Sequence, residues 1–552
     1  MAQANSTILK KIVLDPITRI EGHLRIETEL ADGLVTNAWS TGSLFRGIEI
    51  ILKGRNPEDA WLFTQRVCGV CTYVHGAASV RSVEDAVGLS VLPGNARIIR
   101  NLLMGAQFLH DHLIHFYHLH ALDWVDLASA LEANPDDTSV LAEKVSPDAP
   151  EIDFRAVQSR LKVFVESGQL GPFAKGYWGH EAYKLSPEQN LLFVAHYFEA
   201  LRQQAVTARM HAIFGGKNPH VQSLRVGGVT CGDDINGERI EEFRSILKDT
   251  KDFIDNFYIP DVRVFANEYP EWGELGGNDN FLVYGEFQES DKPESLLFPQ
   301  GVIFNFNTRD EVIKPLDTLQ ILEHVTHSWY EGIKALHPDT GETVPNYTGL
   351  NTSDRYSWLK APRYNGSPME VGPLARILVA YLKDQAEVKA AVDNFLSSLD
   401  LKPIPPVAWL NSTLGRTVAR ALETQIIADA MSDWVDDLVA GAGAYAPSNI
   451  PKFGEGMGLN EAPRGALGHW INIENAKIAN YQMVVPSTWN FGPRCAENIP
   501  GPVEHALVNT AVADAERPLE ILRTIHSFDP CIACAVHVLD RKTARKYQVK
   551  VM

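Results

Sequence analysis

Apolar residues recur every three or four positions over long stretches of the chain, which is the spacing of one face of an α-helix. The longest of these stretches contain few helix-breaking residues. Helices are predicted over Asn101–Leu127, Gln189–Phe214, Ile240–Phe257, Leu374–Ser397 and Thr413–Val439. The pattern therefore predicts a protein that is helical over much of its length.

Alternation of apolar and polar residues is confined to short segments, which predicts short strands. These segments are His23–Leu30, Leu34–Trp39, Val302–Asn307, Trp470–Ile473 and Asn480–Val485. Clusters of Pro, Gly, Asn and Asp predict loops at Asn134–Asp153, Asn267–Asn280, His337–Tyr364 and Leu401–Pro406. The predicted fold class is mainly α (α+β), with one large helix-rich body. The pattern leaves open whether the two ends of the chain meet.

Length and charge narrow the possible functions. A chain of 552 residues could form about three or four domains, but no flexible Gly/Ser linker divides it. The net charge of −19 argues against nucleic-acid binding, which needs a basic face. No apolar run approaches the roughly 18–20 residues of a membrane span. The polar segment Met1–Lys11 lacks the apolar stretch of a secretory signal.

Two Cys-x-x-Cys pairs, one near each end, contain four of the six cysteines. The first motif is Arg66-Val-Cys68-Gly-Val-Cys71-Thr-Tyr-Val-His75, and the second is Asp529-Pro-Cys531-Ile-Ala-Cys534-Ala-Val-His537. In each pair, a turn after the first cysteine brings the second sulfur to the same side, within reach of one metal ion. The two pairs therefore predict a metal centre.

The spacing of the cysteines does not identify the metal. A lone Cys-x-x-Cys also occurs in thioredoxin-like redox pairs, and four cysteines form structural zinc sites. Two details weaken the zinc hypothesis: Cys71 and Cys531 lie 460 positions apart, and the flanking residues are more ionisable than a closed structural site requires. Thiolates suit nickel and iron as well as zinc, so the residues alone leave these metals open.

Further motifs occur in order along the chain. They are Asp15-Pro-Ile-Thr-Arg-Ile-Glu21-Gly-His23, Phe45-Arg-Gly-Ile-Glu49, His115-Phe-Tyr-His-Leu, Gly176-Tyr-Trp-Gly-His180, Glu461-Ala-Pro-Arg464-Gly and Tyr481-Gln-Met483-Val-Val-Pro486-Ser487-Thr-Trp-Asn. With the cysteine pairs, they resemble the large subunit of nickel–iron hydrogenases, especially the periplasmic uptake enzymes of sulfate reducers and enteric bacteria. The resemblance implies a central helical bundle with small peripheral β-sheets, and terminal cysteine motifs that meet at a buried metal site.

The resemblance also implies a nickel–iron centre that splits H2 heterolytically into a proton and a hydride, or runs the reverse reaction. All four cysteines would bind nickel. Cys68 and Cys531 would be terminal ligands, while Cys71 and Cys534 would also bridge to iron. The iron would carry carbon monoxide and two cyanide ligands.

Roles for neighbouring residues follow from the same resemblance. Arg464 would lie over the open side of the metals, near one cyanide. Ser487 and the Pro486 backbone would hold the other cyanide. Asp529 and Asp111 would surround the metals together with Arg464.

The resemblance assigns proton transfer to Glu21, which would take the proton from Cys531. His75 would lie near the iron and a bridging sulfur. A second metal, magnesium (or iron), would be bound by Glu49, the Met483 carbonyl and His537, with waters completing its coordination.

Electrons from H2 need a relay that this chain lacks. With four cysteines committed to the centre, the remaining two cannot bind an iron–sulfur cluster by the usual four-cysteine rule. The resemblance implies an iron–sulfur small subunit, and through it a cytochrome-type electron acceptor. A twin-arginine signal on that subunit would carry the folded pair into the periplasm.

The end of the chain differs in charge from its acidic body, because residues 538–552 contain five basic residues and one acidic residue. By resemblance, residues 1–537 would be a single intertwined domain. Residues 538–552 would be an extension that a maturation endopeptidase removes after metal-insertion proteins have acted. The alternatives are a non-catalytic scaffold held by a four-cysteine zinc site, and a respiratory quinone-reducing subunit of the same ancestry, although such subunits lack the four cysteines.

Overall fold

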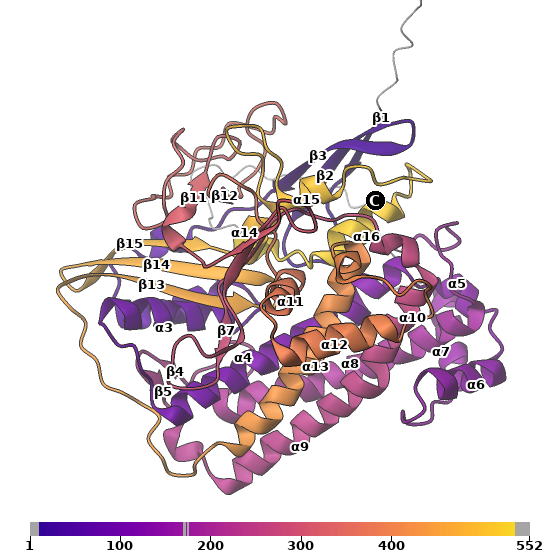
Figure 1. Ribbon diagram of the computed structural model, residues 1–552, viewed down its shortest axis with the longest axis horizontal. Helices are drawn as coiled ribbons and strands as arrows, with labels where there is room; N and C mark the ends of the chain where they lie inside the picture. Colours follow the sequence, from indigo (N-terminus) through magenta and orange to yellow (C-terminus); the bar gives the residue numbers. More distant parts are fainter. Residues whose placement is uncertain (1–9, 169–172, 174–175, 536–552) are drawn as a thin grey trace, which may run out of the picture.

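A computed structural model describes residues 10–168, 173 and 176–535, with the backbone alone for Cys534 and Ala535. The main helical layer lies in the lower half of Figure 1. It consists of four long helices that pack against one another: α4 (Gly94–Ile114), α8 (Pro187–Gly215), α9 (Gly237–Phe253) and α13 (Thr413–Asp436). Helices α4 and α13 are buried over most of their length, which explains why their apolar residues extend around the helix.

Side-chain caps define where these helices begin. Ser186 and Gln189 form a capping box at the start of α8, where Pro187 occupies the first helical position. Ser412 accepts a hydrogen bond from the Gly415 amide at the start of α13. The predicted helices at Gln189–Phe214, Ile240–Phe257 and Thr413–Val439 are confirmed within a few residues. The remaining α-helices are α1 (Ile48–Leu52), α2 (Ala60–Thr64), α3 (Val74–Ala86), α5 (Leu127–Ala130), α6 (Pro135–Val145), α7 (Phe154–Ser167), α10 (Ile259–Glu268), α11 (Pro373–Leu382), α12 (Ala386–Ser397), α14 (Pro486–Phe491), α15 (Pro502–Ala506), α16 (Leu519–Ser527) and α17 (Ile532–Ala535).

Three predictions about helices need correction. The segment Leu374–Ser397 forms two helices, α11 and α12, because Asp384 between them adopts a left-handed conformation with φ of 56°. The predicted loop Asn134–Asp153 contains α6, which the Asn134 side chain caps. The predicted helix Asn101–Leu127 begins earlier, at Gly94, and after Ile114 its regular α-helical turns give way to a π-helical turn.

Small antiparallel sheets surround the helices. One contains β1 (Lys10–Leu14), β2 (Leu24–Ala31) and β3 (Leu34–Gly42), and another contains β13 (Phe453–Ala462), β14 (Gly465–Glu474) and β15 (Lys477–Val484). The other strands are β4 (Leu224–Arg225), β5 (Gly228–Val229), β6 (Phe281–Val283), β7 (Glu286–Gln288), β8 (Leu296–Phe298), β9 (Gly301–Phe304), β10 (Val312–Lys314), β11 (Ile321–His324) and β12 (Ala361–Tyr364). The expected helix-rich fold with small peripheral sheets is confirmed.

Helix α3 packs directly on strand β13, on the left of Figure 1. Alternate glycines on the strand allow this contact: a Cβ atom on Gly458 would lie 2.0 Å from the Ala78 carbonyl oxygen, and one on Gly456 would lie 2.2 Å from the Ser82 carbonyl oxygen. Glycine is therefore required where the helix backbone approaches the sheet. The contact holds α3 on the sheet, and α3 begins at Val74, shortly after Cys71.

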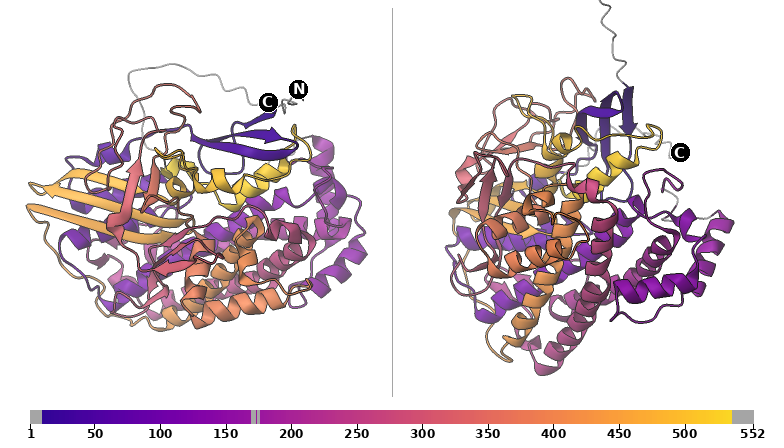
Figure 2. Two further views of the ribbon diagram at one scale, coloured as in Figure 1. Left: turned by 45° about the horizontal axis from the view of Figure 1, so that its top comes forward. Right: turned by 45° about the vertical axis from the view of Figure 1, so that its right-hand side comes forward.

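The two ends of the described chain lie side by side, as Figure 2 shows for the indigo β1–β3 sheet and the yellow C-terminal helices. The Val35 amide donates to the Thr510 carbonyl over 2.9 Å, and Glu21 and Cys531 pair as a parallel β-bridge. These contacts answer the question that the hydrophobic pattern left open. No helix in the described part of the chain is long and apolar enough to cross a membrane.

Candidate metal centre

Three cysteine sulfurs from opposite ends of the chain converge in the interior. The Cys531 sulfur lies 3.4 Å from that of Cys68 and 4.0 Å from that of Cys71, and all three residues are buried. The backbone of Cys534 belongs to α17, directly after Cys531, but its side chain lies outside the described residues. The structure therefore brings together the two motifs that the sequence predicted to form one centre.

The two cysteines of the first motif lie in a tight turn between a short 3₁₀ helix (Gln65–Val67) and α3. The amides of Val70 and Cys71 both donate to the Cys68 sulfur over 3.2 Å. Backbone donors aimed at a sulfur favour the thiolate, which is the form that binds metal. Gln107 on α4 donates to the Val70 carbonyl over 3.0 Å and holds this turn against the main helical layer.

The carboxyl group of Glu21 lies directly beside the Cys531 sulfur. The thiol donates to Glu21 Oε2 over 3.3 Å, and the Ala533 amide donates to the same oxygen over 2.9 Å. Burial, and after it the negative charge of the neighbouring Cys68 thiolate, raises the pKa of Glu21 to about 7. A carboxyl group with this pKa can both accept and release a proton near neutral pH.

A glycine makes the contact between the two terminal segments possible. Gly22 has φ of +84°, and a Cβ atom there would lie 2.4 Å from the Ala533 nitrogen. The Ile532 amide donates to the Glu21 carbonyl over 2.9 Å, so the N-terminal segment lies against the start of α17. Only glycine fits this approach, and it places Glu21 next to Cys531.

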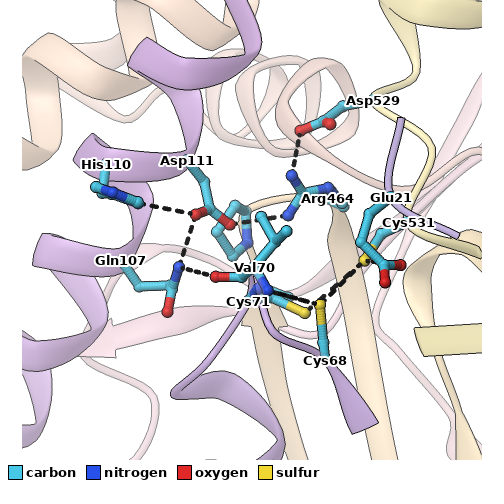
Figure 3. Close-up of polar contacts among 12 residues, drawn as sticks. Glu21, Cys68, Val70, Cys71, Gln107, His110, Asp111, Arg464, Asp529 and Cys531 are labelled. Carbon is cyan, nitrogen blue, oxygen red and sulfur yellow. Dashed lines mark hydrogen bonds and ion pairs between the residues drawn. The ribbon is translucent and has the colours of Figure 1, made fainter. Parts of the chain in front are cut away.

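Arg464 reaches the centre from the tip of the β13–β14 hairpin. Its guanidinium group contacts the Asp111 carboxylate over 2.8 Å and the Asp529 carboxylate over 3.1 Å (Figure 3). Burial alone would lower the pKa of Arg464, but Asp529 and Asp111 outweigh it and raise the pKa well above its usual value. Gln107, one helical turn before Asp111, donates to its carboxylate over 2.7 Å and orients it.

A cavity beside the sulfurs contains polar groups that protein contacts leave unsatisfied. Its lining includes Cys71, His75, Arg464, Pro486, Ser487 and Cys531. Among the described residues, no partner accepts a hydrogen bond from Arg464 Nε or contacts His75 Nε2, and both atoms are buried. The Ser487 hydroxyl accepts a hydrogen bond from the Cys531 amide over 3.0 Å. Thiolate donors beside unsatisfied polar groups fit a bound metal centre that carries polar ligands.

Comparison with known proteins agrees with this geometry. The sequence profile of the family described as "Nickel-dependent hydrogenase" matches residues 46–537, and a "HoxL-like" profile matches residues 11–39. The chain belongs to the nickel-dependent hydrogenase family. The three converging cysteines of this hydrogenase fit the nickel–iron centre that the resemblance implied. The family match does not support the alternative of a scaffold held by a zinc site.

Named relatives match along nearly the whole chain. The chain is 47% identical to an uptake hydrogenase large subunit of Bradyrhizobium diazoefficiens, covering 98% of this chain and 97% of the relative. It is 45% identical to the hydrogenase-1 large chain of Escherichia coli, with the same coverage. Among solved structures, a [NiFeSe] hydrogenase from Desulfovibrio vulgaris Hildenborough has a TM-score of 0.81 and 34% identity, covering 96% of this chain and 100% of that chain.

The predicted second metal site is partly within the described structure. Glu49 is buried, and its carboxylate accepts hydrogen bonds from the Met483 amide over 2.8 Å and from the Thr343 hydroxyl. Glu49 and the Met483 backbone are therefore neighbours, as a shared site requires. The third predicted ligand, His537, lies outside the described residues.

Sequence reasoning missed several residues that shape the hydrogenase centre. Arg46 contacts the Val67 carbonyl and donates to the Ala533 carbonyl over 2.8 Å, which ties the two cysteine motifs together. His220 contacts the Cys68 carbonyl over 2.9 Å. Arg46 lies in the motif that contains Glu49, and Gln107 lies four positions before Asp111, so their spacing was a usable signal. Nothing around His220 in the sequence points to the centre.

A second cluster of possible ligand atoms lies apart from the cysteines. It consists of His120, Asp123 and His526, all buried, with their ligand atoms within 4.8 Å of one another. Arg19 contacts the Asp123 carboxylate over 2.5 Å, and the Trp124 indole donates to His120 Nε2 over 3.0 Å. The Asp123 carboxylate also contacts His526 Nδ1 over 2.6 Å, so the cluster is a buried network of polar contacts that packs α16 against the turns that follow α4.

Proposed function

We propose that this chain is the catalytic subunit of a nickel–iron hydrogenase, which interconverts H2 with protons and electrons. The observation that carries this proposal is the convergence of Cys68, Cys71 and Cys531, from opposite ends of the chain, beside Glu21 and Arg464. Membership of the nickel-dependent hydrogenase family supports the reaction. When bound, a nickel–iron centre supplies the Lewis acidity and redox chemistry that H2 cleavage needs.

In the proposed ligand arrangement, Cys68 and Cys531 would be terminal nickel ligands, while Cys71 and Cys534 would also bridge to iron. The iron would carry carbon monoxide and two cyanide ligands. The convergence of sulfurs around Cys531 and the polar lining of the cavity support a shared metal centre with polar ligands. Ser487, the Pro486 backbone and Arg464 line the cavity, where Ser487 and Pro486 would hold one cyanide and Arg464 would lie near the other.

Glu21 acts as the proton relay in this proposal. The Cys531 sulfur is a hydrogen-bond donor to the Glu21 carboxyl group at 3.3 Å, within the reach that a proton transfer needs. Arg464 brings positive charge to the lining of the same cavity, and its position is fixed by Asp111 and Asp529. His75 presents its imidazole to the same cavity.

A second metal ion, magnesium (or iron), is proposed to bind beside His537. Glu49, the Met483 carbonyl and His537 are the proposed protein ligands. Oxygen donors from a carboxylate and a backbone carbonyl suit magnesium, which usually retains several waters. The burial of Glu49 beside the Met483 backbone supports this site.

The proposed partner is an iron–sulfur small subunit that takes the electrons. Relatives named "large subunit" or "large chain" support a pairing of this kind. A cytochrome-type acceptor would receive electrons through that subunit. We propose a periplasmic location, reached by export together with the small subunit.

The proposed mature chain is a single domain, residues 1–537. Metal-insertion proteins would act first, and an endopeptidase would then remove residues 538–552. The family profile match, which ends at residue 537, supports this boundary. Mass spectrometry of the active enzyme is expected to find His537 as the last residue, and an active full-length chain would contradict the proposal.

Metal analysis and infrared spectroscopy of the purified complex test the function itself. The expected result is nickel and iron together, infrared bands from metal-bound carbon monoxide and cyanide, and H2-dependent reduction of an artificial electron acceptor. Zinc alone, with no such bands and no H2 oxidation, would refute the proposal.

A further inference from the structure

Three buried polar side chains form a hydrogen-bonded line that ends at the metal cavity. His75 Nδ1 lies 3.1 Å from His469 Nε2, and His469 Nδ1 lies 2.8 Å from the Tyr481 hydroxyl. His75 is 1% exposed, while His469 and Tyr481 are completely buried. Buried polar side chains destabilise the folded protein unless each polar group has a hydrogen-bond partner.

The line follows from the packing of three elements. His75 lies in the first turn of α3, which the glycines of β13 hold against the sheet. His469 and Tyr481 lie on the adjacent strands β14 and β15, where Tyr481 is opposite Ile471 and therefore a diagonal neighbour of His469. The packing of α3 on the sheet thus places His469 and Tyr481 in line with His75.

The far nitrogen of His75 is the unsatisfied end of the line. His75 Nε2 is buried and has no hydrogen-bond partner among the residues that the structure describes. His75 also lines the cavity shared by Cys71, Cys531 and Arg464. A buried imidazole nitrogen with its other nitrogen occupied by protein contacts is aimed at a group bound in that cavity.

The chemistry of the groups sets the direction of the hydrogen bonds. A neutral imidazole has one donor and one acceptor nitrogen, so the direction of one bond fixes the next. The Tyr481 phenol is a donor, and an imidazole nitrogen is a stronger acceptor than the nearby Ser79 and Ser82 hydroxyls. If Tyr481 donates to His469 Nδ1, then His469 Nε2 donates to His75 Nδ1. The proton of His75 must then be on Nε2, facing the cavity.

We propose that Tyr481 and His469 are positioning residues that hold His75 in the tautomer with its proton on Nε2, so that an N–H donor faces the metal centre. This inference rests on the proposed function, which places thiolates in that cavity. Thiolate sulfurs accept hydrogen bonds, so they favour an N–H group over an imidazole lone pair. The Tyr481 phenol at one end and the thiolates at the other therefore both favour hydrogen bonds that are donated from Tyr481 toward the cavity.

Nitrogen-15 NMR of histidine-labelled holoenzyme tests the tautomer, with the His75 signals assigned by their loss in His75→Gln. The expected wild-type result is a proton on His75 Nε2 and none on Nδ1. In Tyr481→Phe the terminal donor is lost, so His75 is expected to populate both tautomers, and kcat to fall about tenfold with KM little changed. His469→Phe removes the connecting donor and should have the same effects.

Tyr269→Phe is the matched control, because it removes another fully buried phenol, which donates to the Trp124 carbonyl over 2.7 Å. Its His75 signals are expected to match the wild type. A wild-type proton on His75 Nδ1 would overturn the inference even if no variant folds. Unchanged His75 signals in Tyr481→Phe and His469→Phe would also overturn it. These signals are independent of turnover, whereas a wild-type complex without nickel or H2 oxidation would refute the proposed function.

Discussion

The proposed proton transfer depends on the contact between the Glu21 carboxyl group and the Cys531 sulfur. Replacement of Glu21 by Gln keeps its size but removes its ability to carry a proton from Cys531. We expect hydrogen isotope exchange between H2 and water to fall by on the order of 100-fold, with nickel and iron content unchanged. Glu29→Gln makes the same charge change outside the centre and should leave exchange at the wild-type rate. Normal exchange in Glu21→Gln would remove Glu21 from the proton path.

The raised pKa of Glu21 also predicts a pH dependence of stability. The carboxyl group has an unperturbed pKa of 4.5 and a folded-state pKa of about 7, so the folded protein holds the proton more tightly than the unfolded chain. Its stabilising contribution is present below about pH 4.5 and is lost as the pH rises through about 7. The melting temperature of the wild type should therefore fall relative to that of Glu21→Gln as the pH rises through this range. A difference that stays constant with pH would contradict the shifted pKa.

Arg464 combines a charge with a fixed geometry, and replacement by Lys separates the two. Lysine keeps the positive charge between Asp111 and Asp529 but loses the planar guanidinium group that contacts both. We expect Arg464→Lys to bind the metals and to lose on the order of 100-fold in H2 oxidation rate. Arg494→Lys, a change on the β3 side of the molecule, provides a control for the Arg-to-Lys change itself. Full activity in Arg464→Lys would show that charge alone is sufficient.

At the scale of elements, the junction between the N-terminal segment and α17 can be tested at one position. Gly22→Ala would place a Cβ atom 2.4 Å from the Ala533 nitrogen, whereas Gly33→Ala meets no atom within 4 Å. The two glycines have similar positive φ angles, 84° and 79°, so both variants carry the same conformational strain of roughly 1 kcal/mol. Only Gly22→Ala should separate Glu21 from Cys531, with a larger loss of unfolding free energy and a lower nickel content. Equal effects of the two substitutions would argue against a steric junction.

At the scale of the whole molecule, a buried ion-pair network holds the hairpin that carries Arg464. Arg376 on α11 contacts Glu423 on α13 over 2.9 Å and Glu461 on β13 over 2.6 Å, and it donates to the Pro463 carbonyl over 2.8 Å. All three charged side chains are completely buried. The network therefore connects the helical layer to the residue next to Arg464.

Replacement of Arg376 by Met would leave two carboxylates buried without their counter-charge. We expect the free energy of unfolding to fall by about 3–5 kcal/mol, measured by denaturant titration, and H2 oxidation to weaken as the hairpin shifts. Arg155→Met breaks an ion pair that is 67% and 71% exposed and should leave the unfolding curve unchanged. A similarly small effect of Arg376→Met would show that the network does not brace the hairpin.

Short-range patterns predicted most of the secondary structure but not its interruptions. Repeating apolar residues correctly predicted α8, α9 and α13, because these helices bury a face or their whole surface. The break at Asp384 and the helix that Asn134 caps depend on single residues, which a periodic pattern does not register. The pairing of Glu21 with Cys531 depends on a contact across the whole chain, so no local pattern could predict it.

The sequence by itself determined the ligand types, the two cysteine pairs and the helix-rich class, because these depend on residue identity and local spacing. It also contained the motifs that identify the family. The hydrophobic pattern left open whether the two ends meet, and the family resemblance implied that they do. Only the tertiary structure shows the backbone contacts that join them, such as that between Gly22 and Ala533. It alone placed His469 and Tyr481 behind His75, because side chains from a helix and two strands become neighbours only when the sheet packs on α3.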